Sequence, residues 1–312
     1  MKRLEKEALI ADREAVKQVL AAISDDDPLG RRSFEARLAD IETQLVEIEE
    51  TAESCGVVAL MFGGEPVQGS RSIDAGFASE IVSTFQELVS KKIAADEFGK
   101  LGTRGRVPLH IHTNLAITDL VRGSVGFVLE EVGSNHELAE TVVRKNISEI
   151  TVVIAKTASE NSDDFEQAVE SLDHRLLLSL QEFFRILDER HATVRIVADV
   201  HAALLDSQAV RRGRERVDMT EIIEDESETM IGELLGLLPE SRRFEMRLES
   251  SGEIIKGSVA TAVSPIYLQL IEAPNGGVVG RKWRVKMRTR EVRERNKAPR
   301  KLFVLLGLLE QL

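Results

Sequence analysis

The sequence contains very little cysteine and few aromatic residues. Its 312 residues include one Cys, one Trp and one Tyr, and aromatic side chains make up 4% of the chain. The single Cys55 excludes an intramolecular disulfide, and such cysteine usage is typical of proteins that fold in a reducing compartment. Because aromatic residues are scarce, the cores must be built mainly from Leu, Val, Ile and Ala.

Long uninterrupted apolar segments are missing as well. No window approaches the roughly 18 apolar residues that a membrane-spanning helix needs. The first residues, MKRLEKEALIADRE, carry charges where a signal peptide needs its apolar core. We therefore expect a cytoplasmic protein with no membrane partner. The apolar fraction of 43% and the charged fraction of 30% are typical of a globular chain.

The charge is distributed unevenly along the sequence. The net charge is −12, but from Met230 onward there are 15 Lys and Arg against 9 Asp and Glu, a balance of +6. The preceding residues then have 26 cations against 44 carboxylates, a balance of −18. An acidic body followed by a basic C-terminal segment indicates either two units with different partners or mutual attraction between them.

A chain of this length exceeds one ordinary core and suggests more than one domain. The patterns predict an α+β protein with an N-terminal helical hairpin or coiled coil, a mixed α/β central domain and a small C-terminal β-barrel of OB-like or SH3-like type. The expected ranges are 1–54 for the hairpin, 55–218 for the central domain, 219–229 for an acidic linker and 230–312 for the barrel.

Two helices are predicted at the N-terminus, over Arg3–Ile23 and Arg32–Glu53. The second helix has apolar residues at alternating intervals of three and four, which is a heptad pattern. Such a narrow stripe fits either a hairpin that closes on itself or an element through which copies of the chain associate. The residues of this oligomerisation stripe are Phe34, Leu38, Ile41, Leu45 and Ile48.

The central domain is expected to contain a β-hairpin over Pro108–Val132 and a single long helix over Ser162–Arg190. Within the hairpin, matching the apolar faces of the two strands places His112 opposite Glu130. His110 and His112 share one strand face, so both imidazoles could bind one metal ion, with Glu130 as a third ligand. The other interpretation is that both histidines are solvated on the polar face.

The C-terminal segment has the strand order of a small barrel. Its most distinctive strand alternates Trp283, Val285, Met287 and Thr289 with four cations. This period of two predicts an apolar inward face and a basic outward face. The other strands are expected at Ile231–Leu238, Arg243–Glu249, Glu253–Val259 and Lys301–Leu309, with a short helical or irregular piece near Pro265–Ile271.

The cations of this module are candidates for binding an anionic partner. Like charges in a row on one strand face repel each other unless an anion lies near. That anion is an acidic segment of the same chain, a partner protein or a nucleic-acid backbone. The candidate residues are Arg243, Arg247, Arg284, Lys286, Arg288 and Arg290.

These observations support three functional hypotheses. The first is a non-enzymatic, homo-oligomeric interaction or scaffold protein, such as an accessory or sensor subunit of a larger assembly, which self-associates through the N-terminal helices. The second is DNA or RNA binding through the basic strand. The third is a metal-dependent enzyme that uses the His-x-His strand. No nucleophile motif and no cofactor-binding motif stands out in the sequence, so the first hypothesis is preferred.

Overall fold

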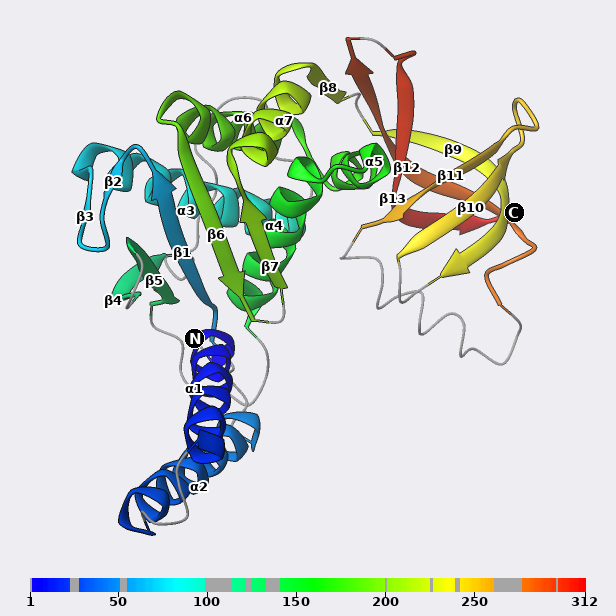
Figure 1. The fold of residues 1–312 in the computed structure, drawn as a ribbon. Helices are drawn as coiled ribbons and strands as arrows, with labels where there is room; N and C mark the ends of the chain where they lie inside the picture. Colours follow the sequence, from blue (N-terminus) through cyan, green and yellow to red (C-terminus); the bar gives the residue numbers. More distant parts are fainter. Residues whose placement is uncertain are drawn as a thin grey trace. The chain divides into compact units, whose positions relative to one another are not determined.

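The fold is mixed α/β and ends in a closed five-stranded barrel (Figure 1). The computed structural model describes residues 2–22, 28–50, 55–98, 114–121, 125–132, 141–199, 201–224, 227–238, 242–260, 277–295 and 297–312. These residues form two compact units. The first comprises Met1–Glu80, His110–Ala155 and Glu189–Ser207; the second comprises Ile81–Leu109, Lys156–Asp188 and Gln208–Leu312. Each unit combines distant segments, whereas the domains expected from the sequence are contiguous ranges. These domain ranges stay predictions.

The first unit contains an antiparallel sheet of five strands in the order β4-β5-β1-β6-β7. Its central strand β1 buries the apolar run Val58–Leu60 and Phe62. Phe62 of β1 meets Phe77 in an edge-to-face contact with 5.3 Å between ring centroids. The strands are β1 (Val57–Gly64), β4 (Leu115–Leu120), β5 (Val125–Glu131), β6 (Ala192–Ala198) and β7 (His201–Leu205), beside a small hairpin of β2 (Val67–Gln68) and β3 (Ser72–Ile73).

The hairpin of β4 and β5 forms, but the predicted register is wrong. Glu130 lies opposite Ala116 instead of His112, and a bulge follows Ile117. Strand β4 extends two residues further toward the turn than expected, to Leu120, and each partner on β5 is shifted along it. Alternating hydrophobicity determines which face a residue occupies, but registers that differ by an even number of residues preserve the same faces. The pattern alone therefore could not identify the register.

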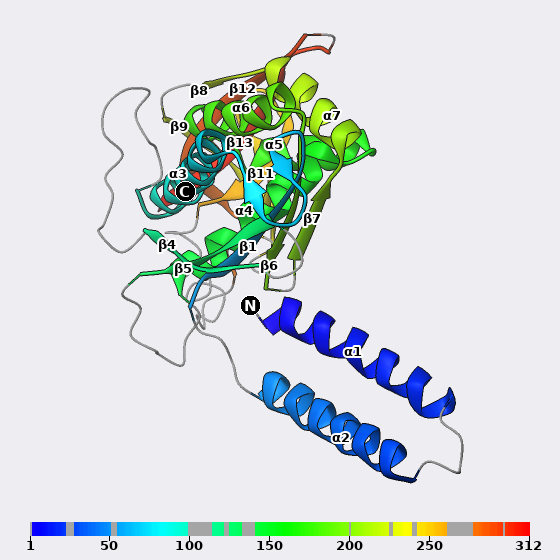
Figure 2. The same cartoon turned by 60° about the vertical axis from the view of Figure 1, so that its left-hand side comes forward.

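The first unit also contains the N-terminal helices α1 (Lys2–Ala22) and α2 (Pro28–Glu50), which lie side by side in two views (Figure 1, Figure 2). Val16 of α1 packs with Ile41 and Leu45 of α2 in a small buried cluster. The two helices therefore pack against each other along the predicted stripe. These contacts lie within one chain.

Five further helices complete the described α-structure. They are α3 (Ala75–Phe98), α4 (Val142–Ala158), α5 (Ser162–Glu170), α6 (His174–Glu189) and α7 (Ser207–Asp218). The expected single helix over Ser162–Arg190 is wrong, because it is divided into α5 and α6. Ser171 ends α5 by donating its hydroxyl to the Ala168 carbonyl at 2.7 Å, and the Asp173 carboxylate caps α6 by accepting from the Leu176 N–H at 2.7 Å. Leu172 keeps the helical spacing of apolar residues across the break, so the break is not visible in the sequence.

The C-terminal barrel belongs to the second unit. Its strands follow the order β13-β11-β10-β9-β12, and the pairing of β12 with β13 closes the ring. Bulges in β10–β9 and β12–β13 bend the strands, as closure of a small barrel requires. The strands are β9 (Glu228–Leu238), β10 (Arg243–Leu248), β11 (Ile254–Val259), β12 (Lys282–Glu294) and β13 (Arg300–Gln311).

Inward-facing side chains fill the barrel, as the period of two predicted. Its core includes Phe244, Met246, Val285, Met287 and Leu305, each at most 1% exposed. The expected strand positions of the module are confirmed within a few residues, whereas Pro265–Ile271 lies outside the described residues. The acidic segment 219–229 was expected to be a linker. Instead, its residues 220–224 form a sixth strand, β8 (Thr220–Glu224), that pairs with β12.

The close contact between α6 and α7 in the second unit predicts that a larger residue at Gly213 is destabilising. A Cβ atom on Gly213 of α7 would lie 2.2 Å from the Phe184 ring of α6, and that ring is completely buried. Gly213→Ala should therefore lower the free energy of unfolding by about 1–3 kcal/mol, although alanine is the better helix former. Urea unfolding followed by circular dichroism measures this change.

Gly307→Ala is the matched control, because a Cβ atom at Gly307 meets nothing within 4 Å. Its unfolding free energy should stay within about 0.5 kcal/mol of the parent. Equal stability of the two variants would contradict the close contact between α6 and α7.

Candidate functional site

The predicted inward face of the basic strand β12 is confirmed. Trp283 is 8% exposed, and Val285 and Met287 are fully buried. The indole N–H of Trp283 donates to the Val278 carbonyl at 3.0 Å, so this buried polar group is satisfied. The strand thus contributes one complete face to the barrel core.

The outward face of β12 is not the solvated row of cations that its sequence indicated. Arg288 and Arg290 are only 4% and 8% exposed. Arg290 Nη1 donates to the Leu172 carbonyl oxygen at 3.0 Å, in the segment between α5 and α6. Pairing with β8 also places Glu224 directly opposite Arg290. The second half of the basic face is therefore covered by other parts of the same unit.

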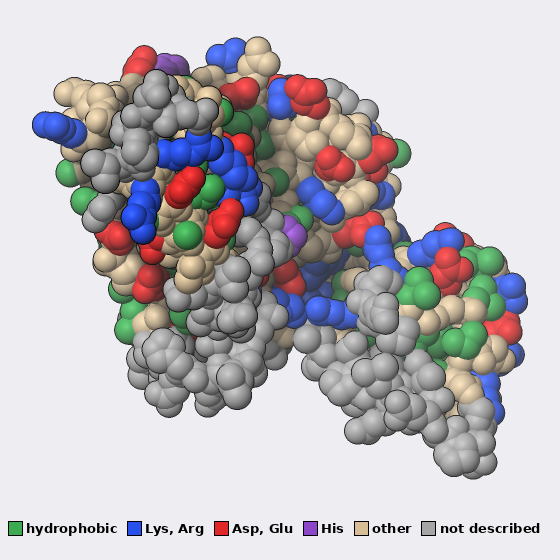
Figure 3. Space-filling model, turned by 60° about the horizontal axis from the view of Figure 1, so that its bottom comes forward, with side chains coloured by type: hydrophobic (Ala, Val, Ile, Leu, Met, Phe, Trp, Pro, Cys, Tyr) green, Lys and Arg blue, Asp and Glu red, His purple; other side chains and the backbone are tan. Residues whose placement is uncertain are grey.

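The remaining candidate cations are mostly engaged with carboxylates of the chain. Arg247 pairs with Glu233 at 2.8 Å, and Arg284 pairs with Glu310 on β13. Lys286 is exposed and has no ion pair within the described part of the chain. On the surface drawn in Figure 3, basic and acidic side chains likewise lie side by side. This geometry favours the interpretation in which the cations face the chain's own carboxylates.

Helix α5 supplies the carboxylates that the sequence could not single out. Lys297 and Arg300, at the turn between β12 and β13, contact Glu166 at 2.7 and 3.2 Å. Arg243 of β10 contacts Glu170 at 2.6 Å. Glu166 and Glu170 are four residues apart and so share one face of the helix. In the sequence, only the spacing of four residues between Glu166 and Glu170 indicated a shared helix face. Many other acidic pairs in this acidic chain have similar spacing, so this pair could not be singled out.

The electrostatics of this contact stabilise charged forms on both sides. The hydrogen bond from Lys297 is the largest cause that holds the pKa of Glu166 below its usual range, and Arg300 lowers it further. The same hydrogen bond raises the pKa of Lys297, to which Glu294 also contributes. The two groups therefore remain ionised together over a wide pH range.

A second arginine cluster, on α7, has a structural role. Arg216 donates to the carbonyl oxygens of Thr157 and Ser159 at 2.9 and 2.6 Å, and Arg212 donates to that of Ala158 at 3.2 Å. These carbonyls lie at the C-terminal end of α4, where the helix dipole favours positive charge. Burial lowers the pKa of Arg216. Two arginines of α7 therefore cap another helix.

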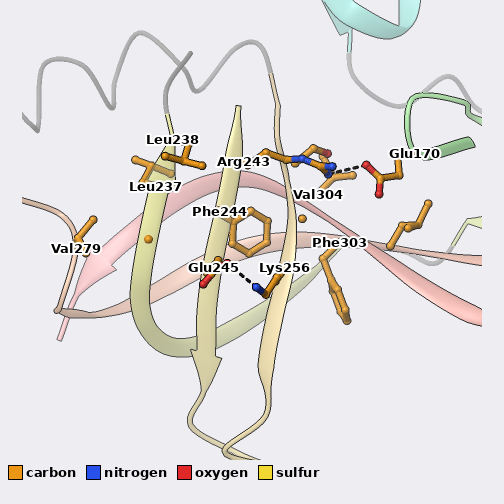
Figure 4. A pocket seen from close by; sticks show the side chains of 14 residues that line it. Glu170, Leu237, Leu238, Arg243, Phe244, Glu245, Lys256, Val279, Phe303 and Val304 are labelled. Atoms are coloured by element: carbon orange, nitrogen blue, oxygen red, sulfur yellow. Dashed lines mark ion pairs between the residues drawn. The ribbon is translucent and has the colours of Figure 1, made fainter. Parts of the chain in front are cut away.

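An apolar cleft lies at one end of the barrel (Figure 4). Its volume is about 730 Å³, which is within the range of small-molecule sites. Its lining comes from β9, β10, β11, β13 and α5, with Leu237, Leu238 and Phe303 among the apolar members. The ion pairs Arg243–Glu170 and Lys256–Glu245 are the charged groups of the lining. The cleft thus combines an apolar surface with a few polar groups.

The candidate metal ligands are only partly described. His110 and His112 lie outside the described residues, while Glu130 lies on β5 opposite Ala116. The described part of the chain contains no group of three His, Cys, Asp or Glu side chains arranged to hold a metal ion. The metal hypothesis stays a prediction, and the register correction removes the reason for choosing Glu130 as third ligand.

A polar cavity of about 540 Å³ in the first unit is lined by residues between Glu65 and Asp74 and by the end of α6. The Asp74 carboxylate accepts from the Phe77 N–H at 2.8 Å and so caps α3. Arg190 lies 3.7 Å from Glu80. Two charged groups of the cavity, Asp74 and Arg190, therefore already have partners in the local structure.

The oligomerisation candidates lie on the side of α2 that contacts α1. Ile41 is 3% exposed and Leu45 9%, while Phe34 and Leu38 are half-buried. The side chain of Ile48 is outside the described residues. The structure brings these residues together with α1 in one chain and leaves part of their apolar surface uncovered.

Of the helices in the described part of the chain, none combines the length and apolarity that a membrane span requires. In comparisons with known proteins, no family model, no curated protein and no solved structure matches this chain. The functional interpretation therefore depends on the geometry alone.

Burial of the basic strand is tested by a pair of substitutions in β12. Arg290→Met removes the donor to the Leu172 carbonyl and leaves that buried acceptor unsatisfied. It should lower the free energy of unfolding by about 1–3 kcal/mol. Lys286→Gln, on the same strand but exposed, should change it by less than about 0.5 kcal/mol. Similar effects of the two substitutions in urea unfolding would contradict the buried position of Arg290.

The α5 contact predicts a specific pH dependence. The carboxyl pKa of Glu166 is lower in the folded than in the unfolded protein, so the unfolded chain binds more protons between the two values. Its stabilisation is present above the unfolded pKa of about 4.3 and is lost as the pH falls through the folded pKa. Glu166→Gln should therefore reduce stability at pH 7 by about 0.5–1 kcal/mol, an amount typical of exposed ion pairs.

At pH 3 the difference between the parent protein and Glu166→Gln should shrink. The control is Glu160→Gln, because Glu160 is exposed just before α5. This substitution should change the unfolding free energy by less than about 0.5 kcal/mol. Urea unfolding at both pH values gives the comparison, and a pH-independent effect of Glu166→Gln would show that the charge of Glu166 is unimportant.

Proposed function

We propose that this protein is a non-enzymatic, homo-oligomeric interaction protein in which the α1–α2 hairpin joins copies of the chain. The observation that carries the proposal is the incomplete burial of the hairpin's apolar side chains. Among its described side chains, Val16, Ile41 and Leu45 are at most 9% exposed. Leu9, Leu20, Phe34 and Leu38 contact this cluster but are only partly buried.

Further apolar residues of α1 are open to solvent. Ile10 is 37% exposed and Val19 is 39% exposed. Two antiparallel helices can cover only one side of each other, and short helices depend on tertiary packing for most of their stability. A second hairpin packed against the first would complete a four-helix bundle and cover the remaining stripe. A second copy of the chain is the simplest source of such a hairpin.

The arrangement of charge supports a scaffold or an accessory or sensor subunit over a nucleic-acid-binding protein. Nucleic-acid affinity comes largely from cations that are free to replace the counterions of phosphates. Here Arg247 and Arg284 are engaged with carboxylates, and Arg288 and Arg290 are buried. Nucleic-acid binding stays the second hypothesis, with exposed Lys286 as its best remaining contact.

The mass of the intact protein in solution tests self-association. We expect sedimentation velocity at micromolar concentration to give twice the chain mass of 34.6 kDa. Leu38→Lys places a charge in the partly covered stripe and should shift the equilibrium toward the monomer by at least tenfold. Circular dichroism checks that its helices remain folded.

Ala36→Lys is the matched control, since Ala36 is an exposed position of the same helix. This variant should associate as the parent does. A parent protein that sediments as a single chain throughout the micromolar range would overturn the proposal, whatever the variants do.

A further inference from the structure

We propose that the cleft at the end of the barrel binds a small amphipathic monocarboxylate, with its apolar chain in the cleft and its carboxylate on Arg243. This binding site is independent of the self-association proposed above, because every lining residue belongs to the barrel or to α5.

The apolar part of the site is preformed by the barrel. Leu237 and Leu238 at the end of β9, Phe244 of β10 and Phe303 of β13 contribute to its lining. Phe244 is 1% exposed and belongs to the barrel core, so the wall that it forms is rigid. Leu238, in contrast, is 62% exposed. An apolar chain in the cleft would remove this surface from water, which favours binding by roughly 25 cal/mol per Å².

The polar part of the site is a set of donors on neighbouring strands. Arg243 of β10 lies directly opposite Ser258 of β11, and both residues line the cleft. Directly opposed residues of an antiparallel pair project from the same face with their Cβ atoms about 5 Å apart. A carboxylate near Arg243 can therefore also accept from the Ser258 hydroxyl. Lys256 lies two residues earlier on β11 and adds a second cation to the lining.

The pair between Arg243 and Glu170 can be exchanged for a ligand. The two side chains are 2.6 Å apart, but they are 46% and 33% exposed. Ion pairs with this degree of exposure contribute little to stability, so replacing Glu170 by another carboxylate costs little. In Figure 4 the Arg243 side chain points toward Glu170 at the edge of the cleft. The present partner thus occupies the position of the ligand's carboxylate.

The guanidinium of Arg243 decides in favour of an anion over a cation. The lining itself is neutral, with Arg243 and Lys256 against Glu170 and Glu245. The whole chain carries a net charge of −12, so the choice depends on the contact with Arg243 itself. A guanidinium matches a carboxylate in two parallel hydrogen bonds, a geometry that a ligand cation facing Glu170 does not gain. An amphipathic carboxylate therefore fits both halves of the site.

Calorimetric titration of the full-length protein with octanoate tests the proposal. We expect one octanoate per chain, and affinity that rises about threefold to fourfold for each methylene group added between hexanoate and decanoate. Octanol, which lacks the charge, and octylammonium, which reverses it, should each bind at least tenfold more weakly.

Two substitutions should change octanoate affinity in opposite directions. Arg243→Gln removes the guanidinium and should weaken octanoate about tenfold while leaving octanol within twofold. Glu170→Gln frees Arg243 from its present partner and should tighten octanoate severalfold. Arg247→Gln is the matched control, because Arg247 is on the same strand but pairs with Glu233 outside the cleft lining. Its affinity should equal that of the parent.

Three outcomes would overturn the proposal. One is no binding of octanoate to protein that is folded by circular dichroism. Another is binding that Arg243→Gln and Arg247→Gln weaken equally, which would indicate general attraction to a basic surface. The third is tighter binding of octylammonium than of octanoate, which would assign the ligand charge to Glu170 or Glu245.

Discussion

The second unit depends on the contact between the cations of the barrel and the helical segment α5. Arg290 reaches a main-chain carbonyl just after α5, while Lys297, Arg300 and Arg243 reach two of the carboxylates of α5. The exposed ion pairs are individually weak, whereas the buried hydrogen bond of Arg290 is costly to break. Arg290 therefore holds the segment in place, and the surrounding pairs determine its orientation and its response to pH.

This contact changes what the basic strand can do. A row of free cations would be a nucleic-acid surface, but Arg288 and Arg290 of this row are buried and Arg284 is paired, which leaves Lys286. Part of the acidic character of the preceding chain complements this row, since α5 and β8 place carboxylates where the barrel presents cations. The basic module is thus partly neutralised within the chain, and the apolar cleft becomes the more distinctive feature of the barrel.

Local periodicity predicted much of this fold. The alternation around Trp283 identified β12 and its inward face, and similar alternation identified the strands that precede and follow it. Features that depend on distant partners were missed. The burial of Arg288 and Arg290 and the strand formed by the acidic segment result from contacts between segments far apart in the sequence. The register of Glu130 was missed because the alternating pattern fits more than one register of the hairpin. The break between α5 and α6 was missed for a local reason, since Leu172 maintains the apolar period through it.

The cleft and α5 share one ion pair. Glu170 contributes both to the contact that holds α5 and to the lining of the cleft, because its partner Arg243 belongs to both. A carboxylate that binds Arg243 must displace Glu170 and so weaken one attachment of α5 to the barrel. By thermodynamic linkage, whatever loosens α5 must in turn strengthen binding of the carboxylate, by the same free energy. The exposed pair is weak, so this coupling is small, and the hydrogen bond of Arg290 keeps α5 attached. A ligand in the cleft would therefore adjust the orientation of α5 without releasing it.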